Sequence, residues 1–294
     1  MRLYKVKWKP EPSFDLRSKG GIAVRFFTWF RPEQNDFEYA ERAIRAGLDG
    51  FEIVYRESYL EPRVHEEYVA NLQRLKVELG ASFTLHAPSH DVNLGSLNRR
   101  VRQAAFDEIK ASIDFARKIR SSIVVVHPVL GILGMPEGKW SKEYDPPKRE
   151  DENLARQEAY LVRAVKDLAD YAPDIMLCLE NLVYPHEIYR SPEDMAELIR
   201  KINRTNVGVT LDVGHASTCG YKPVDFLHLL QDHVFHVHLH DNDGIIDQHL
   251  PLGEGIVDYV AVLKSLRDMD YQGVVNFEFM LDDPSGYRKY VQHR

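Results

Sequence analysis

The sequence predicts an α/β protein built as one eight-stranded (β/α)8 barrel. Eight short apolar runs each precede a stretch of helical character. The apolar runs span Ile22–Phe27, Gly50–Tyr55, Ser82–Pro88, Ser122–Pro128, Met176–Asn181, Val207–His215, Val234–Asp241 and Gly273–Met280. Strands that alternate with helices pair in parallel through crossovers, and eight such units in 294 residues fit a closed barrel. A doubly wound open sheet is disfavoured, because no phosphate-binding Gly fingerprint follows the first run.

The segments between these runs supply the predicted helices. They span residues 36–47, 63–79, 98–120, 151–172, 192–203, 223–231, 256–269 and 284–292. Two segments lie outside the repeat. Residues 1–20 form an N-terminal extension, which we expect either to cover the barrel floor or to be a frayed tail. Residues 129–150 carry glycine, proline and mixed charge, so we predict a loop insertion over the active face of a single barrel domain, residues 21–294.

Composition narrows the cellular context and the partners. The formal net charge of −7 provides no broad basic surface for nucleic acid. The only two cysteines are Cys178 and Cys219, so we expect a reducing compartment. No apolar run approaches the ~20 residues of a membrane span. We therefore expect a cytoplasmic protein without a membrane partner, and an oligomer is left open.

Histidine and acidic residues collect at or just beyond the ends of six consecutive predicted strands. These residues are His86, His127, Glu180, Asp212, His215, His238, Asp247, His249 and Glu278. One such residue alone is usually a hydrogen-bonded rim residue or half of an ion pair. Nine at matching strand ends are better explained by a bound cation, because burying many ionisable groups unpaired is costly.

Strand parity aims several of these side chains into the barrel. Successive side chains of a strand alternate between its two faces. In the seventh run, Val237 suits the helix layer, which leaves His236, His238 and His240 facing inward; the same reasoning points Glu278 inward. Imidazole mixed with carboxylate favours Zn, Mn, Fe or Co over Ca. We therefore predict a divalent-metal enzyme.

Other residues carry weaker signals. Glu52 shares a strand face with Val54, so it either aims into the barrel or forms a salt bridge in the core. Trp29 and Tyr184 lie near strand ends, where aromatic side chains either wall a sugar pocket or pack at the rim.

The ordered strand-end motifs resemble those of a known group of barrels. They are LHAP (85–88), VVHP (125–128), LEN (179–181), LDVGH (211–215), HLHDN (238–242), DQHLPLGEG (247–255) and FE (277–278). Their order and spacing over roughly residues 20–280 resemble the xylose isomerase-like TIM barrel superfamily, which includes endonuclease IV and the sugar and sugar-phosphate isomerases and epimerases. No single motif is specific.

The resemblance implies two nested metal sites and one to three ions per chain. By similarity to the isomerases and epimerases, one metal would be held by the inner set Glu180, Asp212, His238 and Glu278. By similarity to endonuclease IV, which holds three zinc ions, the outer set would add His86, His127, His215, Asp247 and His249.

The sequence also departs from both patterns. The segment from His86 to His90 lacks the residues that endonuclease IV inserts into DNA. The position six residues after Glu180, where the epimerases typically place a substrate-binding Glu, is His186. The loop after the seventh strand lacks the Arg that they often carry there.

Two functions remain open on this basis. We favour a sugar or sugar-phosphate isomerase or epimerase, in which Glu180 and Glu278 shuttle a proton through a metal-stabilised enediolate and His215 binds a hydroxyl. We expect His90, Asn181 and Trp29 to contact this small substrate.

The alternative is a zinc phosphoesterase of the endonuclease IV type with several metal ions. The surplus of ligands favours it, whereas the missing insertion residues make nucleic acid the less favoured partner. A metal-binding protein without catalysis, or a hydrolase or dehydratase of another small molecule, is a third class.

Overall fold

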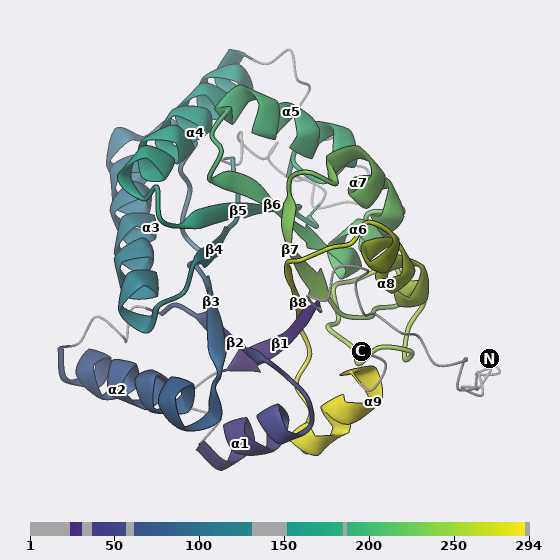
Figure 1. Cartoon of the computed structure of the whole chain (residues 1–294). Helices are drawn as coiled ribbons and strands as arrows, with labels where there is room; N and C mark the ends of the chain where they lie inside the picture. Colours follow the sequence, from purple (N-terminus) through teal and green to yellow (C-terminus); the bar gives the residue numbers. More distant parts are fainter. Residues whose placement is uncertain (1–23, 31–36, 57–61, 131–151, 185–186, 292–294) are drawn as a thin grey trace.

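The barrel closes through eight parallel strands in chain order, as predicted (Figure 1). The structure, a computed structural model, describes residues 24–30, 37–56, 62–130, 152–184 and 187–291. The strands are β1 (Arg25–Phe30), β2 (Gly50–Val54), β3 (Ser82–His86), β4 (Ile123–Val126), β5 (Met176–Glu180), β6 (Val207–Asp212), β7 (Val234–Leu239) and β8 (Val274–Phe277). Each pairs in parallel with its neighbours, and β1 closes the barrel against β8.

Helices follow the strands and form the outer layer (Figure 1). They are α1 (Phe37–Arg45), α2 (Pro62–Leu79), α3 (Arg99–Ile119), α4 (Glu152–Tyr171), α5 (Pro192–Ile202), α6 (Val213–Thr218), α7 (Pro223–Leu230), α8 (Tyr259–Asp268) and α9 (Arg288–Val291), the last preceded by a 3-10 turn over Pro284–Tyr287. Several boundaries differ from the prediction by one to three residues. The first strand begins at Arg25 and continues to Phe30, and the sixth ends at Asp212, where α6 begins.

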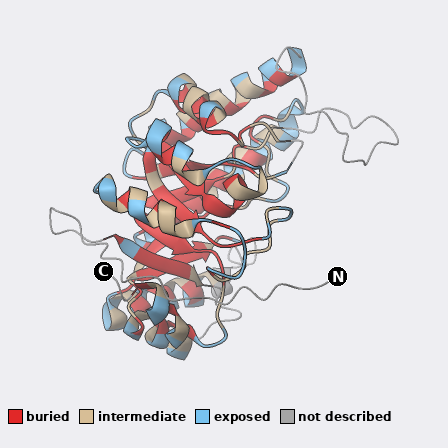
Figure 2. Ribbon diagram, turned by 90° about the vertical axis from the view of Figure 1, so that its right-hand side faces the viewer, coloured by how far each residue is buried: buried red, intermediate tan, exposed pale blue. Residues whose placement is uncertain are grey.

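The buried residues follow the barrel wall and the inner helix faces (Figure 2). In β5 and β8, the inward side chains change from apolar to polar along the strand. In β8 the order is Val274, Asn276, then Glu278 just beyond its end; in β5, Cys178 precedes Glu180. A small apolar cluster that includes Cys178 and Val274 therefore lies below the ionisable groups, which gather at the carboxyl ends of the strands.

Two predicted segments fall outside this description. The extension over residues 1–20 lies outside the described residues, as does the insertion from residue 131 onward. Among the helices that the structure describes, none combines the length and the apolar character needed to cross a membrane.

Candidate metal centre

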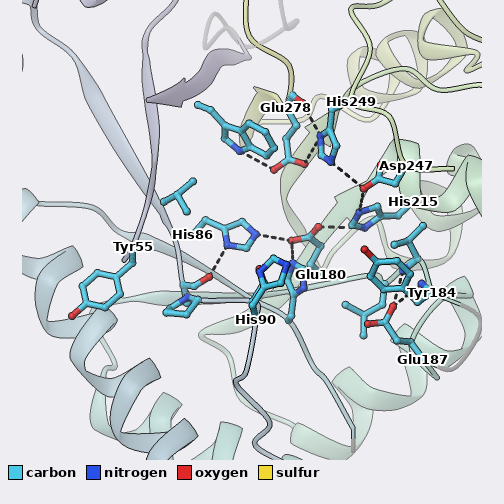
Figure 3. A pocket seen from close by; sticks show the side chains of 18 of the residues that line it. Tyr55, His86, His90, Glu180, Tyr184, Glu187, His215, Asp247, His249 and Glu278 are labelled. Carbon is cyan, nitrogen blue, oxygen red and sulfur yellow. Dashed lines mark hydrogen bonds and ion pairs between the residues drawn. The ribbon is translucent and has the colours of Figure 1, made fainter. Parts of the chain in front are cut away.

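A cavity of about 520 Å³ opens at the carboxyl ends of the strands (Figure 3). Its walls include most of the predicted site residues. These are Trp29, His86, His90, His127, Glu180, His215, Asp247, His249 and Glu278. The remaining predicted residues, Asn181, Asp212 and His238, are fully buried beside it. The strand ends thus bring together residues that are far apart in the sequence.

The inner set forms one compact group of potential metal-ligand atoms, the inner donor group. One ligand atom from each of Glu180, Asp212, His238 and Glu278 lies within 4.8 Å of all the others. Nδ1 of His238 is central: it lies 3.4 Å from Oε1 of Glu180, 3.7 Å from Oδ2 of Asp212 and 3.0 Å from Oε1 of Glu278. These four side chains are at most 3% exposed.

Glu180 also belongs to a second donor group. Its Oε2 lies 3.2 Å from Nε2 of His86 and 3.0 Å from Nε2 of His127. Nδ1 of His86 lies 2.7 Å from the Ala87 carbonyl oxygen, an acceptor that places the ring proton there and turns Nε2 toward Glu180. The two oxygens of Glu180 therefore face different groups.

A third group forms on the other side of the cavity, around Asp247. Its Oδ2 lies 3.3 Å from Nε2 of His215 and 3.0 Å from Nε2 of His249. Nδ1 of each histidine faces a backbone carbonyl, that of Asn181 at 2.8 Å for His215 and that of Glu278 at 2.7 Å for His249. The two rings are thereby oriented with Nε2 toward the cavity.

Two buried residues hold Asp212 in place. Asn181, expected to contact the substrate, instead uses its amide on the Asp212 backbone: Nδ2 donates to the carbonyl at 2.9 Å, and Oδ1 accepts from the amide at 2.8 Å. His240 Nε2 lies 3.2 and 3.3 Å from the two carboxylate oxygens of Asp212. Strand parity predicted that His240 faces inward, and His240 lies within the HLHDN motif, but it was not among the predicted site residues. It completes the third donor group.

The loop that carries Asp247 and His249 is organised by a residue that the sequence did not mark. The buried carboxylate of Asp241 accepts hydrogen bonds from the backbone amides of Asn242, Gly253 and Val257, each at 2.9 Å. These three backbone donors satisfy the buried carboxylate and fix the path of the loop.

Electrostatics inside the site favour ionised carboxylates and protonated imidazoles. Burial alone would raise the pKa of Glu180, but His127 and His238 lower it well below its usual range. Burial likewise opposes the charge of His238, yet Glu278 and Glu52 raise its pKa well above the usual value. Without a cation, protons therefore balance the buried negative charge.

His249 provides a pH test of this balance. Burial opposes its charge, but Asp247 and Glu278 outweigh burial and raise its pKa to about 9. A raised histidine pKa stabilises the fold fully below the unfolded pKa of about 6.5, and the gain is lost as the pH rises through about 9. In metal-free protein, the free energy of unfolding of the wild type should exceed that of His249→Gln most below pH 6.5, and the difference should shrink by pH 9. Urea titrations at several pH values measure it; a constant difference would contradict the assignment.

The donor chemistry fits a divalent metal ion. Nδ1 of His238 lies close to three carboxylates, yet neither it nor Oδ1 of Asp247 has a hydrogen-bond partner among the described residues. Potential metal-ligand atoms that converge on one point without hydrogen bonds between them are typical of the ligands of a shared cation. A mixture of imidazole and carboxylate suits Zn, Mn or Co. The described residues contain four such clusters: the inner group, the groups around His86 and around Asp247, and Glu52 with His236 and His238.

The cavity walls contribute groups beyond these donors. Trp29 Nε1 donates to Oε1 of Glu278 at 3.0 Å, and its ring lies 5.0 Å from that of His249. His90 and Tyr184 are exposed at the wall (Figure 3). Glu187, also at the wall, accepts from the Val183 and Tyr184 amides and belongs to none of the donor groups.

Comparison with known proteins identifies the family. The sequence profile of the family described as "Xylose isomerase-like TIM barrel" matches residues 40–292. An uncharacterised protein of Methanocaldococcus jannaschii is 34% identical over 92% of this chain and 88% of its own length. A fructoselysine 3-epimerase of Shigella flexneri is 22% identical over 72% of this chain and 73% of its own. The crystal structure of a D-tagatose 3-epimerase-like protein superposes with a TM-score of 0.72 and 27% identity, covering 92% of this chain and 96% of that one. The chain therefore belongs to the xylose isomerase-like TIM barrel family.

Proposed function

We propose that the protein is a metal-dependent isomerase or epimerase of a small sugar or sugar phosphate. The observation that carries the proposal is the inner donor group, which places two carboxylates, Glu180 and Glu278, beside one potential cation site in the wall of the cavity. A cavity of about 520 Å³ is within the size range of small-ligand pockets. The similarity to a fructoselysine 3-epimerase and a D-tagatose 3-epimerase-like protein supports the same chemistry.

Proton transfer is the step that the protein's own residues perform. A bound divalent ion supplies Lewis acidity toward substrate oxygens. One carboxylate takes the proton from the carbon next to the substrate carbonyl, which leaves an enediolate. The other returns a proton to that carbon from the opposite face, or to its neighbour, for epimerisation or isomerisation respectively.

The surrounding residues prepare the two carboxylates for these roles. The hydrogen bond from Trp29 occupies Oε1 of Glu278 and leaves Oε2 to exchange the proton. His215 and His90 lie at the wall, where they bind substrate hydroxyls, and the Trp29 ring excludes water from one side.

Solvent proton exchange tests the proposal directly. The metal-loaded protein should exchange the carbon-bound proton of at least one member of a panel of ketoses and ketose phosphates in D2O, read by NMR. Glu278→Gln should lower the exchange rate about 10²- to 10⁴-fold, the range of a general acid–base group. Glu187→Gln is the matched control, because it alters a carboxylate of the same cavity outside the donor groups. Absence of exchange across the panel would refute the proposal.

A second candidate, a zinc phosphoesterase, is favoured by one specific observation. The groups around His86 and His127, and around Asp247, offer donors that a single ion does not need. Two or three ions could clamp a phosphate and supply a hydroxide nucleophile. Two measurements together distinguish the candidates. One is elemental analysis of the purified protein, and the other is a set of hydrolysis assays on phosphate esters and an abasic DNA duplex. Three zinc ions per chain with hydrolysis and no exchange would replace the first candidate.

A further inference from the structure

Glu52 lies inside the barrel directly behind the inner donor group. It is fully buried on β2, and neither proposed reaction gives it a role. Oε1 of Glu52 lies 3.1 Å from Nε2 of His238, the nitrogen on the far side of that ring from the donor group. The carboxylate therefore contacts a proposed metal ligand from the side away from the inner donor group. With His236 and His238 it forms a separate cluster whose ligand atoms lie within 4.8 Å of one another.

Both oxygens of Glu52 are held by donors. Oε1 accepts from Nδ2 of Asn276 at 3.0 Å, and Oε2 accepts from the hydroxyl of Thr84 at 3.0 Å. Nε2 of His236 lies 3.1 Å from Oε2, as Nε2 of His238 does from Oε1. These two contacts are ion pairs without hydrogen-bond geometry. An ionised carboxylate accepts and cannot donate, so it favours a proton on each facing imidazole nitrogen.

This arrangement favours one tautomer of His238. An imidazole with its proton on Nε2 presents a lone pair at Nδ1 when it is neutral. Nδ1 is the atom that faces Glu180, Asp212 and Glu278. The ring is thus prepared to act as a metal ligand rather than as a donor to those carboxylates.

We propose that Glu52 is a positioning residue for the metal centre, which fixes the orientation and tautomer of His238 so that Nδ1 binds the cation. This inference rests on the proposed metal site. The carboxylate partner also increases the basicity of the ligating imidazole, and loss of such a partner typically weakens metal binding 10- to 100-fold. A carboxylate that only stabilised the core would affect folding and leave metal affinity unchanged.

The substitution Glu52→Gln separates these two roles. The side chain keeps its shape, but its amide group cannot accept from His236 and His238 at both ends. We expect the dissociation constant for Zn²⁺, measured by chelator competition, to rise about 10- to 100-fold. The d–d absorption of the Co²⁺-loaded protein should change as well, because it reports the ligand geometry.

Thr84→Val is the matched control. It removes a donor from the same carboxylate on the Oε2 side and leaves the contact with His238 in place. Metal affinity and the Co²⁺ spectrum should stay close to wild type in this variant. The unfolding midpoint of each metal-free variant records any effect on the fold separately.

The outcomes distinguish the two proposals. If the wild type binds no metal, the proposed function fails. If the wild type binds Zn²⁺ and Glu52→Gln binds it equally well, the role of Glu52 is overturned while the function stands. If Glu52→Gln does not fold, ¹⁵N-histidine NMR of the metal-loaded wild type decides, with the His238 signals assigned by their loss in His238→Asn. A proton on Nε2 and a metal-bound Nδ1 support the role of Glu52, and the reverse pattern excludes it.

Discussion

Replacing Glu180 by glutamine is expected to lower proton-exchange activity about 10³-fold or more. Oε1 of Glu180 faces the inner donor group and Oε2 faces His86 and His127, so one carboxylate serves two groups. Glutamine offers only one ligating oxygen. Its NH2 group would face either the cation or the imidazoles of His86 and His127. Loss of a general acid–base group alone costs about 10²- to 10⁴-fold, and weakened metal binding adds to it.

Metal content and rate should be measured on the same preparation of Glu180→Gln. The control is Glu158→Gln, a carboxylate on α4 that pairs with Lys201 outside the cavity. That variant should keep its metal and its activity. Full exchange activity in Glu180→Gln would show that the proton is carried elsewhere and would remove the central residue of the proposed mechanism.

The barrel could be predicted because its periodicity is local. Apolar runs of strand length that alternate with amphipathic stretches do not depend on distant contacts. The end of β6 could not be placed in the same way. The carboxylate of Asp212 accepts from the amide of His215 at 2.6 Å and begins α6, whereas the small and apolar residues Val213 and Gly214 read as a continued strand. An Asp at a helix N-cap was the available signal.

The donor groups were partly predictable because inward parity and strand ends are also local properties. Nine residues selected by these criteria lie in or beside one cavity. The residues that support them were harder to recognise, because their roles depend on partners far away in the chain. Asn181 binds the backbone of Asp212, 31 residues on, and Glu52 meets Asn276 across 224 residues. Only the closed barrel shows whether such a side chain meets the substrate or a ligand.

Removing the metal is expected to have the second large effect, on activity and on stability together. A cation that binds only the folded state stabilises it by about 4 kcal/mol when free metal exceeds the dissociation constant a thousandfold. For a domain of this size that corresponds to a rise of roughly 7 °C in the unfolding midpoint. Thermal unfolding with a chelator, and again after Zn²⁺, Mn²⁺ or Co²⁺ is restored, measures the shift. Exchange activity should fall to background and return with the metal.

The physical reason for this stabilisation lies in the buried carboxylates. Burial opposes the ionisation of Glu180 and Asp212, but the neighbouring imidazoles lower the pKa of each carboxyl well below its usual range. A cation pairs with these carboxylates and leaves neutral imidazoles, so metal binding releases protons and weakens as the pH falls. The double variant Asp212→Asn and Glu278→Gln keeps the shape of both side chains but loses two ligands of the inner group. Its unfolding midpoint should therefore respond far less to added metal. An equal shift in that variant would place the stabilising ion outside the inner group and would argue against these four residues as its site.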